Sequence, residues 1–378
     1  MYPHASGYGY ADDTLHRALR LKFQAPKEAQ LAEVRQTLQT IADRIGAEVH
    51  ELLLPELGFL SRALDKHQRG VLSDALTLPY ANDNVAQQQT LKDMVKIEES
   101  KERMVPLKPL MDEYGYAATF SKSPIHEACG QFAGQQRVMH LRREVAHKAC
   151  LVAHGLNAAG LQPHFEDCWR HKDVQEGLFL RRLALVARQF WDRKYDWRKV
   201  KTVSSSFTAP VPGLAGHMAG AAIDIRIRDL DKKKEFLPLG NDYAEGGASS
   251  SLRFPYLTFE EWRTRTLVAQ TMRMAGFKLL DTEDWHGSHG DRGLSTGGNV
   301  KMRTAIYGPL DDFDRETGEV RPLERIKVEN PFTTDREIED IVDIALERNG
   351  GGNNWKNSVL EVAQHFREMR SRESISIT

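Results

Sequence analysis

The sequence predicts an α+β protein in which helices flank a small antiparallel sheet. Residues 113–310 mix helical and extended segments without the regular strand–helix alternation that a parallel α/β sheet requires. The regions on either side are patterned mainly as helices. We therefore expect an N-terminal helical extension over 1–112, a central domain over 113–310, and a C-terminal helical extension over 311–378.

The composition places the chain among soluble globular proteins. It has 378 residues, of which 40% are hydrophobic and 28% are charged. The formal net charge of −1 gives no basic field that would favour nucleic acid or an anionic membrane as a partner. No stretch approaches the roughly 20 apolar residues that span a bilayer. We therefore expect a soluble protein that binds neither nucleic acid nor membrane.

The cysteines and the N-terminus predict a cytoplasmic location. The three cysteines form no CxxC pair and cannot all pair within one chain, which is typical of reduced thiols. The opening "MYPHASGYGYADDTLHRALR" has neither the basic start nor the apolar run of a secretory signal.

Residues 26–112 are predicted to be helical. "PKEAQLAEVRQTLQTIADRI" begins with proline at a plausible first helical position, and its apolar residues recur at three- and four-residue steps. "TLKDMVKIEESKERMV" is rich in charged residues and is also patterned as a helix, and Pro106 and Pro109 mark a boundary after it. Such an extension can pack on the central domain, or it can join copies of the chain into a homo-oligomer.

The first half of the central domain predicts two helices around an extended segment. "REVAHKACLVAHGLNAAG" is patterned as a helix that ends near Gly160. "LQPHFEDCWR" is expected to be extended and then to turn, and "DVQEGLFLRRLALVARQFW" to form the next helix.

The second half predicts a strand, a helix and a further extended piece. In "AAIDIRIRDL" the isoleucines alternate with Asp224, Arg226 and Arg228, so the two sets face opposite sides of a strand. "TFEEWRTRTLVAQTMRMAGF" has Thr258 and Glu261 at capping-box spacing and can end at its glycine. The next segment, "KLLDTEDWH", is predicted to be extended.

After residue 310 the sequence begins with the turn-rich "DDFDRETGEV". Two charged helical stretches follow, separated by "NGGGNN", a joint of glycine and asparagine.

Two polar residues, His217 and Asp224, are flanked by small and apolar residues in "GHMAGAAIDIRI". Here His217 precedes Asp224 by seven residues, and the neighbouring glycines permit a tight loop that folds the histidine back beside the strand. A buried carboxylate needs a cation or a hydrogen-bond donor. This pair alone fits either a structural His–Asp hydrogen bond or part of a metal site.

The segment "EDWH" supplies a second carboxylate and a second imidazole. With His286, the pair His217 and Asp224 would form the three-ligand set of a catalytic zinc site, which keeps its fourth position for water. Glu283 is then placed to act as the base. Residues 283 and 286 face opposite sides of a straight strand, so the segment must twist or turn here, and Gly287 is a candidate for permitting it.

These motifs together resemble those of a known enzyme family. His217-x-x-Gly220-x-Ala222-x-Asp224, followed by Glu283-x-Trp285-His286, is similar to the zinc signature of D-alanyl-D-alanine dipeptidases and related peptidoglycan carboxypeptidases. The resemblance covers roughly residues 113–290. It includes the helix, strand and arginine-bearing turn of "LRREVAHKACLVAHGLNAAGLQPHFEDCWRHKDVQ", where Trp169-Arg170 stands in place of the usual Tyr-Arg.

The resemblance implies a role for each of these residues. His217, Asp224 and His286 would hold Zn²⁺, and Glu283 would act as general base and then as general acid. Arg170 would donate to the scissile carbonyl oxygen as it becomes an oxyanion. Without the resemblance, Arg170 would be read as a surface ion pair with Glu166 or Asp167.

The chain departs from the family pattern at three places. Ala215 replaces the serine that usually helps to hold the substrate, and His171 replaces the proline that follows the arginine. After the second histidine the chain continues "GSHGD" rather than with an aromatic residue. These departures leave the zinc chemistry intact and bear on specificity for D-Ala-D-Ala.

The resemblance therefore predicts a zinc peptidase domain over 113–310 that hydrolyses a small D-amino-acid-containing peptide such as D-Ala-D-Ala. One alternative is an L,D- or D,D-carboxypeptidase or endopeptidase that acts on peptidoglycan stem peptides. Another is a non-catalytic binding module on the same fold.

Overall fold

The computed structural model describes residues 95–189, 197–292 and 304–323, apart from 211, 232–234, 253 and 255. It also describes several residues between 53 and 73, together with residues 336 and 340. The predicted helix "PKEAQLAEVRQTLQTIADRI" and the helical stretches expected around "NGGGNN" lie outside the described residues, and so does a homo-oligomer contact through them.

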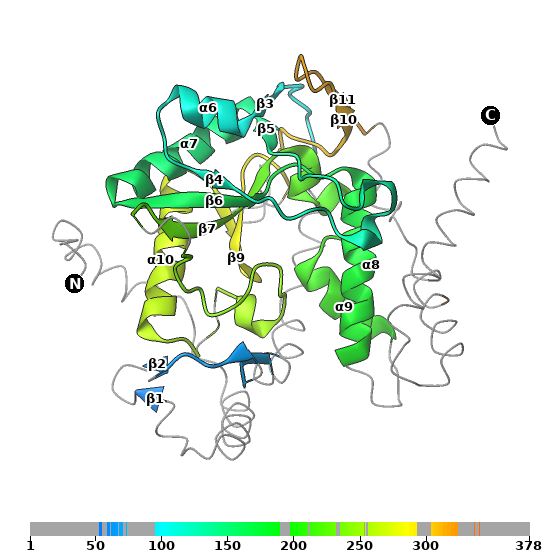
Figure 1. Cartoon of the computed structure of the whole chain (residues 1–378). Coiled ribbons are helices and arrows are strands. Elements are labelled where there is room, and N and C mark those ends of the chain that lie inside the picture. The colour runs from blue at the N-terminus through cyan, green and yellow to red at the C-terminus, as the bar shows by residue number, and fades with distance from the viewer. Residues whose placement is uncertain are drawn as a thin grey trace.

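A five-stranded sheet forms the centre of the molecule (Figure 1). The order across the sheet is β4 (Thr119–Phe120), β6 (Leu161–Asp167), β7 (Ala222–Asp229), β9 (Glu283–Ser288) and β8 (Lys278–Leu280). The pairs from β6 to β8 are antiparallel, whereas β4 pairs in parallel with β6 at one edge. The α+β prediction is confirmed, and the sheet is mixed rather than wholly antiparallel.

Two helices cover the apolar face of this sheet. They are α7 (Arg143–Ala158) and α10 (Phe259–Met274). The β7 isoleucines Ile223, Ile225 and Ile227 are fully buried and belong to one core cluster with side chains of both helices. The alternation read from the sequence therefore separates an apolar face under α7 and α10 from a polar face that carries Asp224.

The polar face looks towards a second helical layer, formed by α8 (Lys172–Gln189) and α9 (Trp197–Phe207). The predicted helices correspond to α7, α8 and α10. At the start of α10 the capping box forms as expected, because the Thr258 hydroxyl accepts from Glu261 N and the Glu261 carboxylate accepts from Thr258 N.

The helical prediction for residues 26–112 is wrong for the described residues 95–106. This stretch is extended: Ile97 bridges to Ala305, and β3 (Met104–Pro106) pairs antiparallel with β5 (His140–Arg142). Its charged residues favour a helix locally, but Glu99 and Glu102 bind groups on the body of the protein instead. Tertiary contacts therefore override local propensity. Further upstream, β1 (Leu53–Leu54) pairs antiparallel with β2 (Phe59–Leu60).

The predicted boundaries near residues 112 and 310 fall inside folded elements. Residues 107–113 form α6 (Leu107–Glu113), whose Leu107 and Met111 are fully buried in the central core. The turn-rich segment after 310 forms most of an antiparallel hairpin, whose strands are β10 (Leu310–Phe313) and β11 (Val320–Pro322). The central body thus includes residues on both sides of 113–310.

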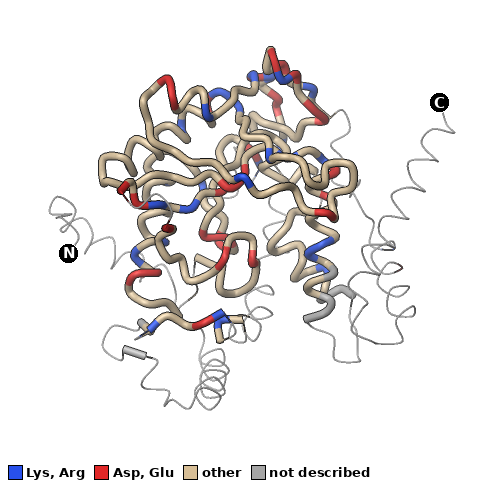
Figure 2. The backbone as a smooth tube through the Cα atoms, in the orientation of Figure 1, with Lys and Arg blue, Asp and Glu red and all other residues tan. Residues whose placement is uncertain are grey.

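Short 3₁₀ helices complete the connections. They are η1 (Glu127–Phe132), η2 (Pro212–Leu214), η3 (Gly216–Ala219) and η4 (Ala248–Ser250). All three cysteines are buried free thiols. Among the described residues, no helix combines the length and the apolar composition that a bilayer span requires. Figure 2 shows basic and acidic residues interspersed over the described chain.

Candidate metal centre

The two histidines and the aspartate singled out in the sequence meet in the structure. His217 Nε2 lies 3.1 Å from Asp224 Oδ1 and 3.2 Å from His286 Nδ1, and His286 Nδ1 lies 2.9 Å from Asp224 Oδ1. His217 and Asp224 are buried, and the His286 side chain is 11% exposed. Three potential ligand atoms therefore form a nearly equilateral triangle.

The sheet and one tight loop build this triangle. Asp224 on β7 lies directly opposite His286 on β9 in the antiparallel register. His217 lies on η3, which ends at Gly220 with a left-handed φ of 66°. At Gly216 an added Cβ would overlap the Asp291 carboxylate. The expectation that glycines fold His217 back beside the strand is confirmed.

A strand irregularity brings Glu283 to the same side as His286. Leu279 pairs with Gly287, but the next residue, Leu280, pairs with Glu283, so three residues of β9 bulge out of register. Glu283 Oε2 consequently lies 3.7 Å from His286 Nδ1. Gly287 contributes differently from the prediction: its missing Cβ permits close packing, since such an atom would lie 2.8 Å from a Met272 sulfur.

Hydrogen bonds orient two of the three ligands. His217 Nδ1 lies 2.5 Å from the Cys168 carbonyl oxygen, which can only accept, so Nδ1 carries a proton and Nε2 is the ring atom that faces Asp224 and His286. Asp224 Oδ2 accepts from the Tyr243 hydroxyl at 2.8 Å and from Arg170 Nη2 at 3.1 Å. The second oxygen, Oδ1, is left facing the imidazoles.

Asp224 remains ionised in this environment. Burial alone would raise its pKa, but the imidazoles of His217 and His286 hold the pKa of Asp224 well below its usual range. An ionised carboxylate oxygen therefore faces one nitrogen of each imidazole.

The triangle has the dimensions of a metal site. Ligands bound to tetrahedral zinc at roughly 2.0–2.2 Å lie about 3.3 Å apart, close to the 2.9–3.2 Å found here. Two nitrogens and one oxygen form a donor set suited to zinc. The buried group His217, Asp224 and His286 could therefore hold a metal ion.

Glu283 has the surroundings of a residue that exchanges protons near neutral pH. Its side chain is 13% exposed. Burial, reinforced by the negative charge of Asp224, raises the pKa of Glu283 to about 7, while His286 opposes this shift. A carboxyl group with such a pKa can both accept and release a proton at physiological pH.

Arg170 lies beside the triangle rather than on the surface, with its side chain 14% exposed. Its Nε lies 2.8 Å from Asp167 Oδ2, Nη1 donates to Gln175 at 3.2 Å, and Nη2 pairs with Asp224. The Asp167 ion pair considered from the sequence is therefore present, but Glu166 lies near Arg226 instead. These contacts use three of the five guanidinium N–H groups, so two remain for a ligand.

Tyr243 is a further residue of the site, and no sequence pattern predicted it. It follows β7 in a loop without a recognisable pattern, yet its hydroxyl contacts Asp224 and its ring packs edge-on against Trp285, with ring centroids 5.5 Å apart. Burial raises the pKa of Tyr243 well above its usual range, so the hydroxyl remains a donor.

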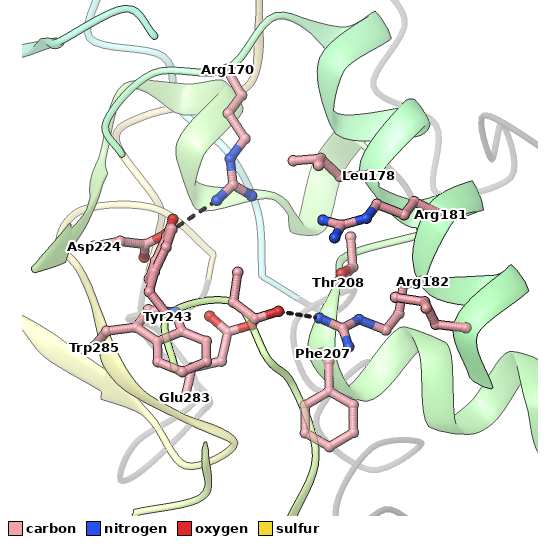
Figure 3. Close-up of a pocket in the computed structure, with 12 residues that line it drawn as sticks. Arg170, Leu178, Arg181, Arg182, Phe207, Thr208, Asp224, Tyr243, Glu283 and Trp285 are labelled. Carbon is pink, nitrogen blue, oxygen red and sulfur yellow. Dashed lines mark hydrogen bonds and ion pairs between the residues drawn. The ribbon is translucent and has the colours of Figure 1, made fainter. Parts of the chain in front are cut away.

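A cavity of about 60 Å³ opens next to these residues. Figure 3 shows Arg170, Asp224, Tyr243 and Glu283 around one side and α8 residues on the other. Two potential proton-exchange or ligand groups, Glu283 and Asp224, thus line a space that a small molecule can enter.

Neither a family model nor a curated protein matches this chain. The function is therefore inferred from the geometry of the site.

Proposed function

We propose that the protein is a zinc-dependent peptidase that hydrolyses a short D-amino-acid-containing peptide such as D-Ala-D-Ala. The observation that supports it most strongly is the buried triangle of His217 Nε2, Asp224 Oδ1 and His286 Nδ1, with Glu283 beside it at a cavity wall. A zinc ion held by this donor set would lower the pKa of water to around 7 and polarise the scissile carbonyl.

The chain's own residues then move the protons and hold the charge. Glu283 accepts a proton from the water that attacks the carbonyl carbon, and it delivers that proton to the amine nitrogen as the C–N bond breaks. Arg170 directs its remaining N–H groups at the carbonyl oxygen as negative charge develops there, an interaction of the kind worth about 2.7–4 kcal/mol in other enzymes. Tyr243 and Arg170 hold Asp224 in place throughout.

The proposed setting is the cytoplasm, where the three free thiols are stable and a free dipeptide or muropeptide fragment is a suitable substrate.

Metal analysis coupled to a dipeptide-hydrolysis screen tests the proposal. We expect about one zinc per chain and hydrolysis that a chelator abolishes and zinc restores. Glu283→Gln should retain zinc and lose hydrolysis. Glu245→Gln is the matched control, because the Glu245 carboxylate accepts from Asp242 N and does not line the cavity. Full activity of Glu283→Gln would remove this residue from the mechanism.

The alternative activity, on longer peptidoglycan stem peptides, draws support from a second and larger cavity. This chamber of about 300 Å³ shares Arg170 and Tyr243 with the smaller cavity, so it could take a longer chain. A comparison of D-Ala-D-Ala with a stem pentapeptide decides between the two activities. A zinc-loaded protein that cleaves neither would favour a non-catalytic binding module.

A further inference from the structure

The larger chamber and the small cavity meet along one boundary. Both are lined by Arg170, Leu178, Arg181, Tyr243 and Ala244. Beyond that boundary the chamber has an apolar wall composed of Ile125, Phe132, Val138, Trp169 and Val174. A ligand that reaches Glu283 can therefore extend past the boundary residues into an apolar space.

Three arginines line the small cavity, and two of them already have partners. Arg170 pairs with Asp167 and Asp224. Arg182 donates to backbone carbonyls, with Nη2 at 2.8 Å from Ala244 O and Nη1 at 2.7 Å from Glu245 O. The role of Arg182 is therefore to hold the loop that carries Tyr243.

Arg181 is different. In the part of the chain that the structure describes, it makes no ion pair, and its buried Nε has no hydrogen-bond partner. Figure 3 shows its guanidinium pointing into the cavity between Leu178 and Thr208. Burial lowers the pKa of Arg181 and Arg137 lowers it further, but a guanidinium keeps its charge in proteins. A partly desolvated cation without a partner is costly unless a ligand completes it.

The other arginines of the larger chamber do not share this property. Arg137 lies 3.3 Å from Asp167 Oδ2 and also donates to the Glu166 carbonyl. Arg315 pairs with Asp312 and stacks on the Phe313 ring. At the boundary between the two cavities, Arg170 keeps N–H groups for a ligand but pairs with Asp167 and Asp224, whereas Arg181 makes no ion pair or side-chain hydrogen bond within the described part of the chain.

We propose that Arg181 binds a carboxylate of the substrate, so that the protein selects anionic peptides. This inference rests on the proposed function, because it assigns a charge to the peptide that the same site hydrolyses. Glu283 and Asp224 line the small cavity and would repel an incoming anion. Because Arg170 and Arg182 already have partners within the chain, Arg181 supplies the cation that offsets this repulsion. Its planar fork can grip both carboxylate oxygens.

The carboxylate can be the peptide's C-terminus or an acidic side chain. Four probes separate the sources: D-Ala-D-Ala, its C-terminal amide, and two tripeptide amides that differ only in carrying D-Glu or D-Gln. For the wild type we expect kcat/KM to be about 10- to 100-fold higher for the charged member of one pair. Arg181→Met should abolish that preference, mainly by raising KM, and Arg181→Lys should retain part of it.

Arg315→Met is the matched control, since it removes a chamber arginine that already has a partner. It should keep the wild-type preference. Zinc content and melting temperature verify that each variant is folded. If Arg181→Met does not fold, Arg181→Lys is the variant compared with the wild type. Equal rates on both members of both pairs would overturn the proposal, as would a preference that survives in Arg181→Met.

A binding measurement separates failure of this inference from failure of the proposed function. Zinc-loaded Glu283→Gln is titrated calorimetrically with the same four probes, with and without Arg181→Met. If the wild type hydrolyses none of the probes but binds them in a charge-dependent way that requires Arg181, the carboxylate site is supported and the peptidase function is contradicted. If hydrolysis occurs without any dependence on Arg181, the peptidase function is supported and the carboxylate site is contradicted.

Discussion

Two clusters of buried polar side chains in this molecule differ in how their hydrogen-bonding groups and charges are paired. The first surrounds Arg142, which is fully buried. Its Nε donates to the Ala219 carbonyl at 2.9 Å, Nη1 donates to the Glu102 carbonyl at 2.7 Å, and the Glu99 carboxylate lies 3.0 Å away. The guanidinium also lies 5.2 Å from the Tyr307 ring. Here donors meet acceptors.

In the second cluster, three potential metal-ligand atoms face one another. His217 Nε2, Asp224 Oδ1 and His286 Nδ1 converge within 3.2 Å, and the Cys168 carbonyl holds a proton of His217 on the far nitrogen. Lone pairs that face each other repel unless a proton or a metal cation lies between them. The Arg142 cluster is complete within the chain and joins distant segments, whereas the histidine–aspartate cluster is completed by a proton or by a metal ion.

Removing a ligand from the incomplete cluster should have the largest effect on metal binding. Loss of residues that only orient a ligand typically costs 10–100-fold in affinity, and His217→Ala removes a ligand itself. We therefore expect stoichiometric zinc to be lost after dialysis, as measured by metal analysis. Replacement of His164, the buried histidine on β6, is the control and should leave zinc unchanged. Full zinc content in His217→Ala would contradict the assignment.

Breaking the complete cluster should instead reduce stability. Arg142→Met leaves the Glu99 carboxylate, whose side chain is 15% exposed, without its cation. We expect the free energy of unfolding in urea to fall by about 3–5 kcal/mol and the folded fraction to bind zinc as before. The control is Arg103→Met, whose ion pair with Glu319 is exposed and should contribute less than about 1 kcal/mol. If the two variants are equally stable, the Arg142 cluster has no special structural role.

Local patterns predicted the elements whose formation depends on their own residues. The alternation along β7 and the capping box of α10 are properties of short segments, so both could be found without the fold. His217 and Asp224 were found in the same way, because only seven residues separate them. The convergence of His286 followed from the two motifs taken together.

Features that depend on distant contacts were missed or assigned to the wrong cause. The turn between Glu283 and His286 was predicted but assigned to Gly287, whereas the structure produces it through irregular pairing with β8. The partners of Tyr243, Asp224 and Trp285, lie on β7 and β9. Residues 95–106 are extended because their carboxylates reach Arg142 and Tyr307, contacts that helical propensity does not encode. Likewise, Arg181 differs from Arg182 only through its tertiary surroundings.

His164 extends the comparison to a buried histidine outside the candidate metal centre, whose Nε2 lies 3.6 Å from the Glu166 carboxylate. Burial, with Arg228 and Arg226, lowers the pKa of His164 to about 4. Since the unfolded value is about 6.5, the unfolded chain binds the proton more tightly, and stability is lost as the pH falls from about 6.5 towards 4. His164 should contribute about 2 kcal/mol of this loss between pH 7 and pH 5.

Urea unfolding at these two pH values, with chelator present, measures the effect in the wild type and in His164→Gln. The variant should lose less stability on acidification by that amount. An identical pH dependence in both proteins would show that His164 is protonated as readily in the folded state as in the unfolded state.

The smallest predicted effect concerns the second oxygen of Asp224. Tyr243→Phe removes one of the two donors to Oδ2 but keeps the ring against Trp285 and the contact from Arg170. We expect zinc affinity, measured by chelator competition, to fall by about 10-fold with little change in melting temperature. Tyr307→Phe is the matched variant in the Arg142 cluster: its hydroxyl donates to Glu102 at 2.5 Å, so its loss should lower the melting temperature and leave zinc affinity unchanged. The reverse pattern would mean that the site, too, is held together for stability rather than for a ligand.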